Sequence, residues 1–570
     1  MGLRFSRVRP RATTSHLISE AVGKLLCAIE LVCTLALTSS SLAAAASAGS
    51  ANRFQGHLIL GEERPGGIFE VLRDDLGEAN AYGGAARHLP PFDFTFVQSG
   101  NAIIPVRRGA ISGTHPIWEY ILEPGTVSGG PGGAYSQATI PFTLEERNAN
   151  CMHNGTMRFS FRSDGAVSDV AYRITAETCL YFKFNMSGSI AARYVPAQLP
   201  DTAAIIARYN DDVAHRMPLR PIQDLAIDYP GIDPNQFGSP FEVKPEDMTV
   251  YGVIVNGIHY VGGCNSRDGV YPFCAQMDLP SYSVAKSIFA GLESMRLSYL
   301  RPHAMASRIA DYVPECAVEG SWGDVTFGNM LDMASGHYRS ADYMVDEDEA
   351  DMRQFLLADD HATRIAFACD HYPHEAKPGT VWVYHTPDSY LLGTAIRAFY
   401  ESRMQTSSDF YHDLLVAPLW HPLHLDPAID VVRRTYDSVA QPLTGYGMTL
   451  HSDDIAKLSV FLNVNNGQIG GRTVLDETML AGALQRNPRD PGLNAGGPDY
   501  RYNNGFWAWN AQSSLGCKSP AWIPFMSGYG GITIAMMPNG VTYYYVSDGG
   551  SFAWARAAAE SNKIKPFCKI

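Results

Sequence analysis

Apolar and polar side chains alternate through the part of the chain from residue 49 to about residue 198. Met157, Phe159 and Phe161 show the alternation clearly, with a polar residue between each pair. A period of two residues is typical of half-buried strands in an antiparallel sheet. Glycine-rich stretches such as residues 128–133 separate the apolar segments. This pattern predicts a β-rich accessory domain over residues 49–198.

Residues 199–261 show a different pattern of apolar and polar residues. Residues 199–245 combine a helical segment with a Pro/Gly-rich passage that predicts a linker. Two apolar runs, residues 250–255 and 258–261, then flank the dipeptide Asn256-Gly257. Asn-Gly between apolar runs is a strong local signal of a β-hairpin. We therefore expect a second domain over residues 246–570 that opens with a hairpin.

The first 48 residues have a third pattern. Four arginines precede a mostly apolar stretch from Leu25 to Leu37, and small residues then lead to Ala46-Ser47-Ala48. This order is typical of a secretory signal peptide with an A-x-A cleavage site. The apolar stretch is short and contains Glu30, so we expect no stable membrane span after cleavage. The prediction is a secreted or periplasmic protein, and a disordered N-terminal extension is the alternative.

The charge balance narrows the range of partners. Loss of residues 1–48 would remove five basic and two acidic side chains, so the formal charge would change from −14 to −17. An acidic surface repels phosphate backbones and anionic lipids, so we expect neither nucleic acid nor a membrane surface as a partner. The oligomeric state is left open.

Eight cysteines remain after residue 48. An even number in an exported chain predicts disulfide bonds. Proximity in the sequence favours Cys151–Cys179 and Cys264–Cys274, and leaves the pairing of the other four open. The absence of a C-x-x-C spacing argues against a zinc ribbon or a redox dithiol.

Ser283 and Lys286 form an S-x-x-K sequence at the start of a helical pattern. Side chains three residues apart share one face of a helix, so the lysine amine could accept the serine proton if burial keeps the amine neutral. Ser281 is the expected N-cap, and the N–H groups of the first turn could stabilise an oxyanion. The motif alone is weak evidence, because a capped helix with a surface lysine has the same spacing.

Further segments follow Ser283 in a fixed order. They are VTFGNMLDMASGH at 325–337, PGTVWVYHT at 378–386, SYLLG at 389–393, PLW at 418–420, TGYGM at 444–448 and SDDIA at 452–456. Over roughly residues 245–570, this ordered set resembles the class C beta-lactamase-like and penicillin-binding-protein-like serine hydrolases. The resemblance implies an α/β (α+β) domain with an antiparallel sheet, flanking helices and an inserted helical region.

The same resemblance implies catalytic roles. Ser283 would attack a carbonyl and form an acyl-enzyme, while Lys286 and Tyr384 would share the proton transfers. Tyr384 suits this role if its pKa is lowered, which a nearby lysine ammonium would do.

The third family motif corresponds to residues 526–531, Met-Ser-Gly-Tyr-Gly-Gly. By this resemblance, Ser527 and Gly528 would approach the substrate, and the Tyr529 N–H would be a second oxyanion donor. Met526 stands where the family has Lys or His, and Thr386 stands where many relatives have Asn. Loss of that cation disfavours penicillins and peptidoglycan termini as substrates. Family esterases and the 6-aminohexanoate oligomer hydrolases tolerate such variation better. The segments 283–287, 384–386 and Gly505-Phe506-Trp507 are most similar to the 6-aminohexanoate oligomer hydrolases.

We therefore expect a serine hydrolase that cleaves a small ester or amide without a cofactor or metal. A beta-lactamase or D,D-peptidase, an acyltransferase and a catalytically silent binding protein remain alternatives. The histidines at 361, 371, 374, 421 and 424 lack metal-site spacing. The acidic run 346–351 is expected to face solvent, and Asn154 and Asn185 lie in glycosylation sequons.

Overall fold

The structure is a computed structural model that describes residues 52–61, 70–130, 133–266, 269–317, 321–404 and 408–569. The predicted signal peptide lies outside the described residues. None of the helices in the described ranges has the length and hydropathy that a bilayer crossing requires.

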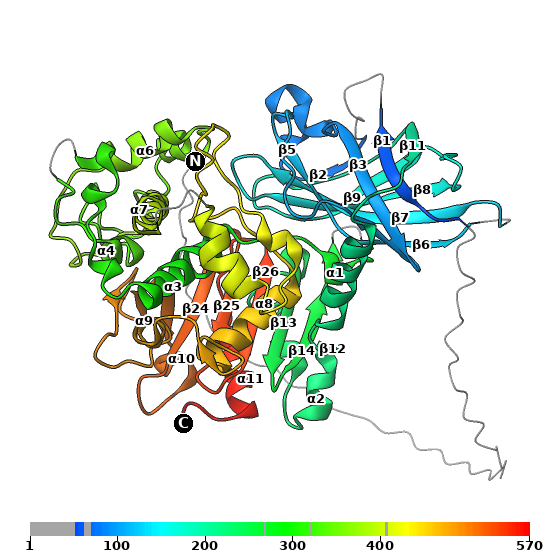
Figure 1. Cartoon of the computed structure of the whole chain (residues 1–570). Helices are drawn as coiled ribbons and strands as arrows, with labels where there is room; N and C mark the ends of the chain where they lie inside the picture. The colour runs from blue at the N-terminus through cyan, green and yellow to red at the C-terminus, as the bar shows by residue number, and fades with distance from the viewer. Residues whose placement is uncertain are drawn as a thin grey trace, which may run out of the picture. The chain divides into compact units, whose positions relative to one another are not determined.

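The first sheet has eleven strands, and every hydrogen-bonded pair in it is antiparallel (Figure 1). Its core contains Trp118, Phe142 and Phe159, each at most 2% exposed. The alternation at Met157, Phe159 and Phe161 falls in a strand of this sheet, so the predicted β-rich region is confirmed. The strands are β1 (Gln55–Leu60), β2 (Glu70–Asp74), β3 (Phe92–Ser99), β4 (Ala102–Pro105), β5 (Trp118–Leu122), β6 (Gly125–Gly129), β7 (Ser136–Glu146), β8 (Met152–Phe161), β9 (Val170–Thr178), β10 (Phe184–Ile190) and β11 (Ala192–Pro196).

The second sheet has nine strands in the order β12-β14-β13-β26-β25-β24-β23-β22-β21. The predicted hairpin is confirmed: Val255 pairs with Ile258, and both turn residues, Asn256 and Gly257, have positive φ. All of its pairs are antiparallel except the edge pair β12–β14, which is parallel and which the sequence did not predict. The strands are β12 (Leu219–Pro221), β13 (Met248–Val255), β14 (Ile258–Gly263), β21 (Leu493–Asn494), β22 (Tyr500–Asn503), β23 (Phe506–Asn510), β24 (Trp522–Gly528), β25 (Ile532–Met536) and β26 (Thr542–Ser547).

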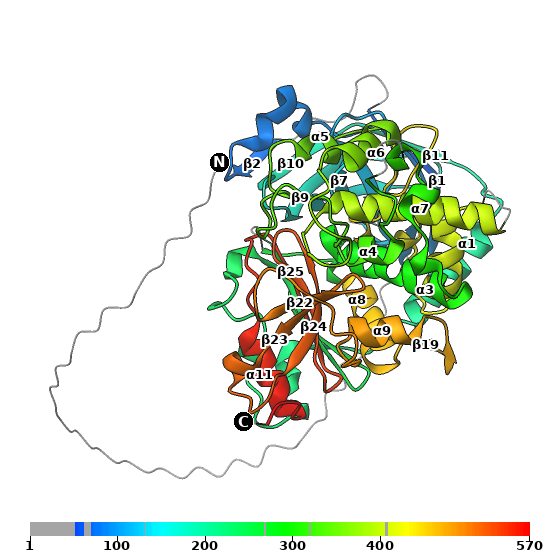
Figure 2. The same ribbon diagram turned by 90° about the vertical axis from the view of Figure 1, so that its left-hand side faces the viewer.

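Helices cover both faces of the second sheet (Figure 2). Ile534 of β25 contributes to a core cluster with the helices that follow Ser283, whereas its neighbour Ala535 packs with Ala557 and Ala558 of the C-terminal helix. The strand period of two thus gives each face its own helical layer. The helices of the described residues include α1 (Thr202–Ala214), α2 (Leu225–Asp228), the π-helix η7 (Lys286–Gly291), α3 (Leu292–Leu300), α4 (Phe327–Leu331), α5 (Met352–Leu356), α6 (His361–Asp370), α7 (Thr386–Met404), the π-helix η11 (His412–Trp420), α8 (Ser452–Ser459), α9 (Glu477–Ala483), α10 (Gln512–Leu515) and α11 (Ala555–Ile564).

Residues 199–245, predicted as a helical segment followed by a linker, take part in packing. Strand β12 extends the second sheet, and Ile222, Leu225 and Phe237 are buried in the core beneath that sheet. The Pro/Gly content of this passage therefore shapes turns between buried side chains.

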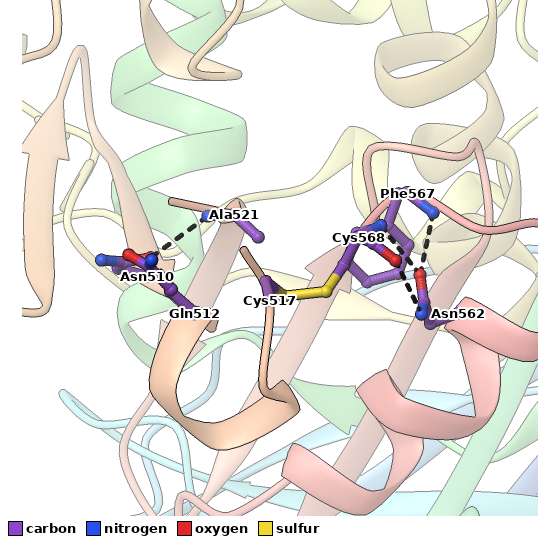
Figure 3. The surroundings of a disulfide bond; sticks show 7 residues. All are labelled: Asn510, Gln512, Cys517, Ala521, Asn562, Phe567 and Cys568. Atoms are coloured by element: carbon purple, nitrogen blue, oxygen red, sulfur yellow. Dashed lines mark hydrogen bonds between the residues drawn. A yellow bond between two sulfur atoms is a disulfide. The ribbon is translucent and has the colours of Figure 1, made fainter. Parts of the chain in front are cut away.

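Four disulfide bonds connect the eight cysteines. The pairs Cys151–Cys179 and Cys264–Cys274 confirm the prediction from proximity. The two longer links are Cys316–Cys369 and Cys517–Cys568. The last of these ties the loop before β24 to the chain terminus, where Asn562 Oδ1 accepts hydrogen bonds from two backbone N–H groups (Figure 3). Four disulfides are typical of proteins from oxidising compartments.

Both sequon asparagines are buried. Asn154 is 1% exposed and Asn185 is 3% exposed. Neither sequon asparagine is therefore accessible in the folded chain.

Candidate active site

Ser283 lies in a short 3-10 turn, η6 (Tyr282–Val284), that follows strand β17 (Leu279–Pro280). The chain continues from this turn into the π-helix η7, which begins at Lys286. Lys286 Nζ donates to Ser283 Oγ at 2.8 Å. The predicted pairing of the two side chains is therefore present, and Ser283 is only half-buried.

Ser281 occupies the expected N-cap position, but its side chain does not cap the turn. Ser281 has helical backbone angles and makes no capping hydrogen bond. Its hydroxyl instead donates to Asn150 Oδ1 at 3.1 Å and accepts from the Met448 N–H at 3.1 Å. The residues before the nucleophile are thus held by tertiary contacts.

Lys286 is buried among neutral oxygen atoms. Its exposed fraction is 3%, and Nζ also donates to Thr386 Oγ1 at 2.9 Å and to the Gly445 carbonyl at 3.4 Å. Burial lowers the pKa of Lys286 to about 8, and the charge of Glu347 opposes that shift. With this pKa, about a tenth of the amine is neutral at pH 7.

The contacts continue from Thr386 to the acidic run. Glu347 accepts hydrogen bonds from the Thr386 hydroxyl and from the Thr386 N–H, the latter at 2.8 Å. Asp346 is 3% exposed and lies 3.1 Å from His385 Nε2. The prediction that this run faces solvent is wrong for Asp346, because backbone N–H groups and His385 satisfy its carboxylate.

Tyr384 is 8% exposed, and its ring centroid lies 4.9 Å from Lys286 Nζ. Burial and the charge of Glu347 raise the pKa of Tyr384 well above its usual value, while interaction with Ser283 opposes the shift. The expected lowering of this pKa is wrong, because desolvation of the phenolate outweighs any attraction to the lysine. Tyr384 is therefore a neutral phenol beside the nucleophile.

Strand β24 brings the third segment to Ser283. A Cβ atom on Gly528 would lie 2.7 Å from the Ser281 carbonyl oxygen, so only glycine permits this approach. The next residue, Tyr529, packs its ring against Tyr282 with centroids 5.5 Å apart. Ser527 is half-buried on the same strand. Gly528 and Tyr529 thus lie beside the nucleophile turn.

The sequence profile named Beta-lactamase matches residues 259–560, more than half of the chain. The chain belongs to the beta-lactamase family. Its mixed α/β (α+β) fold, preceded by the β-rich first sheet, agrees with this assignment.

Two solved structures are similar to this family member. One is a Bacillus anthracis protein described as a 6-aminohexanoate-dimer hydrolase, with 16% identity over 56% of this chain and 78% of that one, at a TM-score of 0.41. The other is EstCE1, a hydrolase with promiscuous acyltransferase activity, with 14% identity over 63% and 99% of the two chains, at a TM-score of 0.42. No curated protein matches the chain.

Met526, which the sequence resemblance aligned with the Lys or His of the third family motif, is 1% exposed and belongs to the apolar core. An aromatic cluster lies next to Tyr384. Trp382 and Trp507 have ring centroids 5.1 Å apart, and Tyr384 stacks on Trp507 at 6.1 Å. Trp382 and Tyr384 lie in one segment that the sequence analysis singled out and Trp507 in another, but the contact between these segments could not be predicted from the sequence.

Two groups of described side chains bring three possible metal ligands together. They are Asp211, His215 and His424, and Glu123, Asp426 and His451. Neither group includes a residue of the Ser283 site. In the second group, the guanidinium of Arg108 already pairs with Glu123 and Asp426.

Proposed function

We propose that the chain is a serine hydrolase of the acyl-enzyme type. The observation that carries this proposal is the 2.8 Å contact between Lys286 Nζ and Ser283 Oγ, made by an amine whose pKa is lowered to about 8. A neutral amine at this distance can accept the hydroxyl proton as the serine oxygen attacks a carbonyl carbon.

The remaining groups complete the reaction. The N–H groups of Ser283 and Tyr529 would stabilise the oxyanion, because Gly528 allows their segments to approach each other. Tyr384, a neutral phenol, would pass the proton from the Lys286 ammonium to the leaving group. Water then attacks the acyl-enzyme, with Lys286 again accepting a proton. The products are an acid and an alcohol or amine, and Ser283 regains its proton.

We propose a small, uncharged ester or amide as the substrate. Buried Met526 offers no cation to a substrate carboxylate, and the aromatic cluster around Trp382 and Trp507 supplies apolar surface beside Tyr384. The four disulfide bonds support an exported enzyme.

Hydrolysis of short-chain p-nitrophenyl esters, measured beside nitrocefin turnover and penicillin labelling, tests the proposal. We expect ester turnover with little reaction of either β-lactam. Preferential nitrocefin turnover would instead identify a beta-lactamase. Folded protein without turnover of any of these compounds would indicate a catalytically silent binding protein.

A further inference from the structure

The turn between strands β7 and β8 of the first sheet contacts the nucleophile segment of the second domain. Asn150 lies in this turn, directly before Cys151 of a disulfide bond, and its side chain is completely buried. Burial of an amide is costly unless its donors and acceptor are satisfied. Asn150 meets that condition through partners that lie mostly in the second domain.

Three donors converge on Asn150 Oδ1. They are the Tyr282 N–H at 2.8 Å, the Ser281 hydroxyl at 3.1 Å and the Gly447 N–H at 3.2 Å. The amide nitrogen donates to Glu145 Oε1 at 2.9 Å, so the orientation of the amide group is fixed. One side chain of the first sheet therefore joins two separate segments of the second domain.

Those two segments carry the nucleophile and hold its base. Tyr282 directly precedes Ser283, and Gly447 follows Gly445, whose carbonyl accepts from Lys286 Nζ. Tyr282 also has a φ of 38°, a left-handed conformation that is unfavourable for a bulky side chain and persists only under external constraint. The hydrogen bond from its N–H to Asn150 supplies such a constraint.

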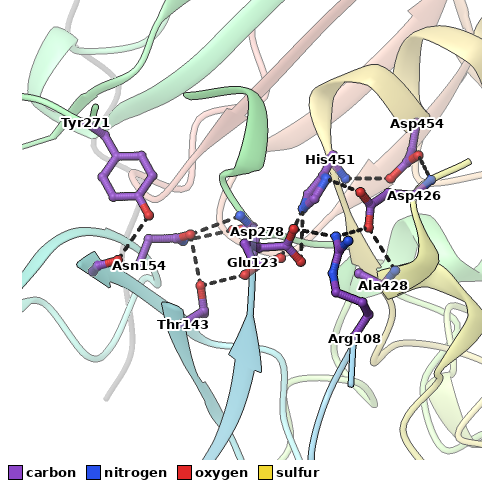
Figure 4. Close-up of polar contacts among 11 residues, drawn as sticks. Arg108, Glu123, Thr143, Asn154, Tyr271, Asp278, Asp426, Ala428, His451 and Asp454 are labelled. Carbon is purple, nitrogen blue, oxygen red and sulfur yellow. Dashed lines mark hydrogen bonds and ion pairs between the residues drawn. The ribbon is translucent and has the colours of Figure 1, made fainter. Parts of the chain in front are cut away.

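A second asparagine of the same sheet contacts the chain further upstream. Asn154 Nδ2 donates to the Asp278 carbonyl and Asn154 Oδ1 accepts from the Asp278 N–H, both at 2.9 Å (Figure 4). Thr143 adds a hydrogen bond to the Asp278 carboxylate at 2.7 Å. These contacts fasten the two domains together without touching Tyr282 or the Gly445–Met448 loop.

We propose that Asn150 is a positioning residue that sets the geometry of Ser283 and Lys286, so that the first sheet is part of the catalytic unit. The proposal rests on the proposed serine hydrolase function. Asn150 itself makes no hydrogen bond to Ser283 or Lys286. It acts through the Tyr282 backbone on one side and through the Gly447 backbone on the other.

The test compares Asn150→Ala with Asn154→Ala in the full chain. Both changes remove a buried amide of the same sheet that hydrogen-bonds to the second domain, but only the first releases the nucleophile segment. The readouts are the rate constant of acylation by a fluorophosphonate, the kcat and KM for a p-nitrophenyl ester, and the thermal midpoint.

For Asn150→Ala we expect at least a ten-fold loss in the acylation rate and in kcat, with KM changed less than three-fold. Asn154→Ala should lower the thermal midpoint but keep the acylation rate within three-fold of the wild-type value. Asn150→Asp keeps an acceptor oxygen but replaces the donor to Glu145 with a second buried carboxyl group, so it should recover only part of the rate. If Asn150→Ala does not fold, Ser281→Ala should still slow acylation at least three-fold.

Equal rate losses in Asn150→Ala and Asn154→Ala would overturn the proposal, because docking of the domains would then explain both. An unchanged rate in Asn150→Ala, or in Ser281→Ala where that variant replaces it, would overturn it too. Failure of the wild-type chain to react with the fluorophosphonate would instead refute the serine hydrolase function.

Discussion

Two buried clusters of charged and polar side chains differ in the oxygen atoms that surround their basic groups. In the active site, Lys286 contacts hydroxyl and carbonyl oxygens, and no carboxylate lies within ion-pair distance of Nζ among the described residues. In the other cluster, which joins the two sheets' domains, Arg108 and His451 contact carboxylates directly. Arg108 lies 2.7 Å from Asp426, and His451 lies 3.2 Å from Asp278 (Figure 4).

The pKa values follow this difference. Burial lowers the pKa of Lys286 because the charged form loses its hydration. Burial acts in the same direction on His451, but the charges of Asp426 and Glu123 outweigh it and raise the pKa of His451 well above its usual value. A buried cation with carboxylate partners is held in its charged form, whereas one with neutral partners can exchange a proton. The comparison therefore separates a reactive site from a structural one.

Replacing Ser283 with Ala should have the largest effect on activity. We expect ester turnover to fall by about four orders of magnitude or more, because loss of the nucleophile disables the whole unit. Ser287→Ala is the matched control. Ser287 lies about one helical turn after Ser283, and its buried hydroxyl donates to the Gly505 carbonyl. Its turnover should stay within about ten-fold of the wild-type rate. Full activity of Ser283→Ala would refute the assignment.

Lys286→Met should lower kcat/KM by about three orders of magnitude, while stability is unchanged or increased because a buried amine is removed. Lys457 provides the contrast, since its amine lies 2.7 Å from Asp453. Lys457→Met should lower stability and leave kcat/KM nearly unchanged. Steady-state kinetics and denaturant unfolding measure both quantities. A stability loss in Lys286→Met as large as that in Lys457→Met would contradict the comparison.

Arg108→Met should mainly affect stability. It removes one of the two cations beside the carboxylates of Glu123 and Asp426 and leaves only His451 with them, and breaking a buried ion pair in this way costs about 3–5 kcal/mol of unfolding free energy. Arg162→Met, at an exposed pair with Asp164, should cost less than about 1 kcal/mol. Unfolding in urea measures the difference. Equal stability of the two variants would show that the ion pairs of Arg108 contribute little to the free energy of unfolding.

Glu347→Gln should have the smallest effect, a shift in pH dependence. Acylation requires neutral Lys286, so the wild-type rate should rise with pH until it levels off above about 8. Because the charge of Glu347 raises the pKa of Lys286, its removal should move the profile to lower pH. Glu349→Gln, nearby in the chain but paired with Arg339, should leave the profile in place. A shift toward higher pH in Glu347→Gln would contradict the electrostatic account.

Local sequence patterns predicted much of this structure. The alternation around Phe159, the Asn256-Gly257 hairpin and the spacing of Ser283 and Lys286 each depend on residues close in the chain. The structure contains all three features. The two disulfides with short loops were likewise predicted from proximity.

What the sequence missed depends on contacts between distant segments. Asn150 and Tyr282 are 132 residues apart, and Thr386 and Glu347 are 39 residues apart. Neither Asn150 nor Glu347 lies in one of the motifs that indicated the family. The pKa of Tyr384 was predicted in the wrong direction because the extent of its burial is a tertiary property. Composition and period carry no information about any of these contacts.

The central claim is that Ser283 is a nucleophile that forms a covalent acyl-enzyme. The most direct test is intact-mass spectrometry of the purified protein after reaction with a fluorophosphonate, followed by peptide mapping of the modified residue. The account predicts a single adduct, located on Ser283 and absent from Ser283→Ala. An adduct on another residue, or no adduct on well-folded protein, would contradict it.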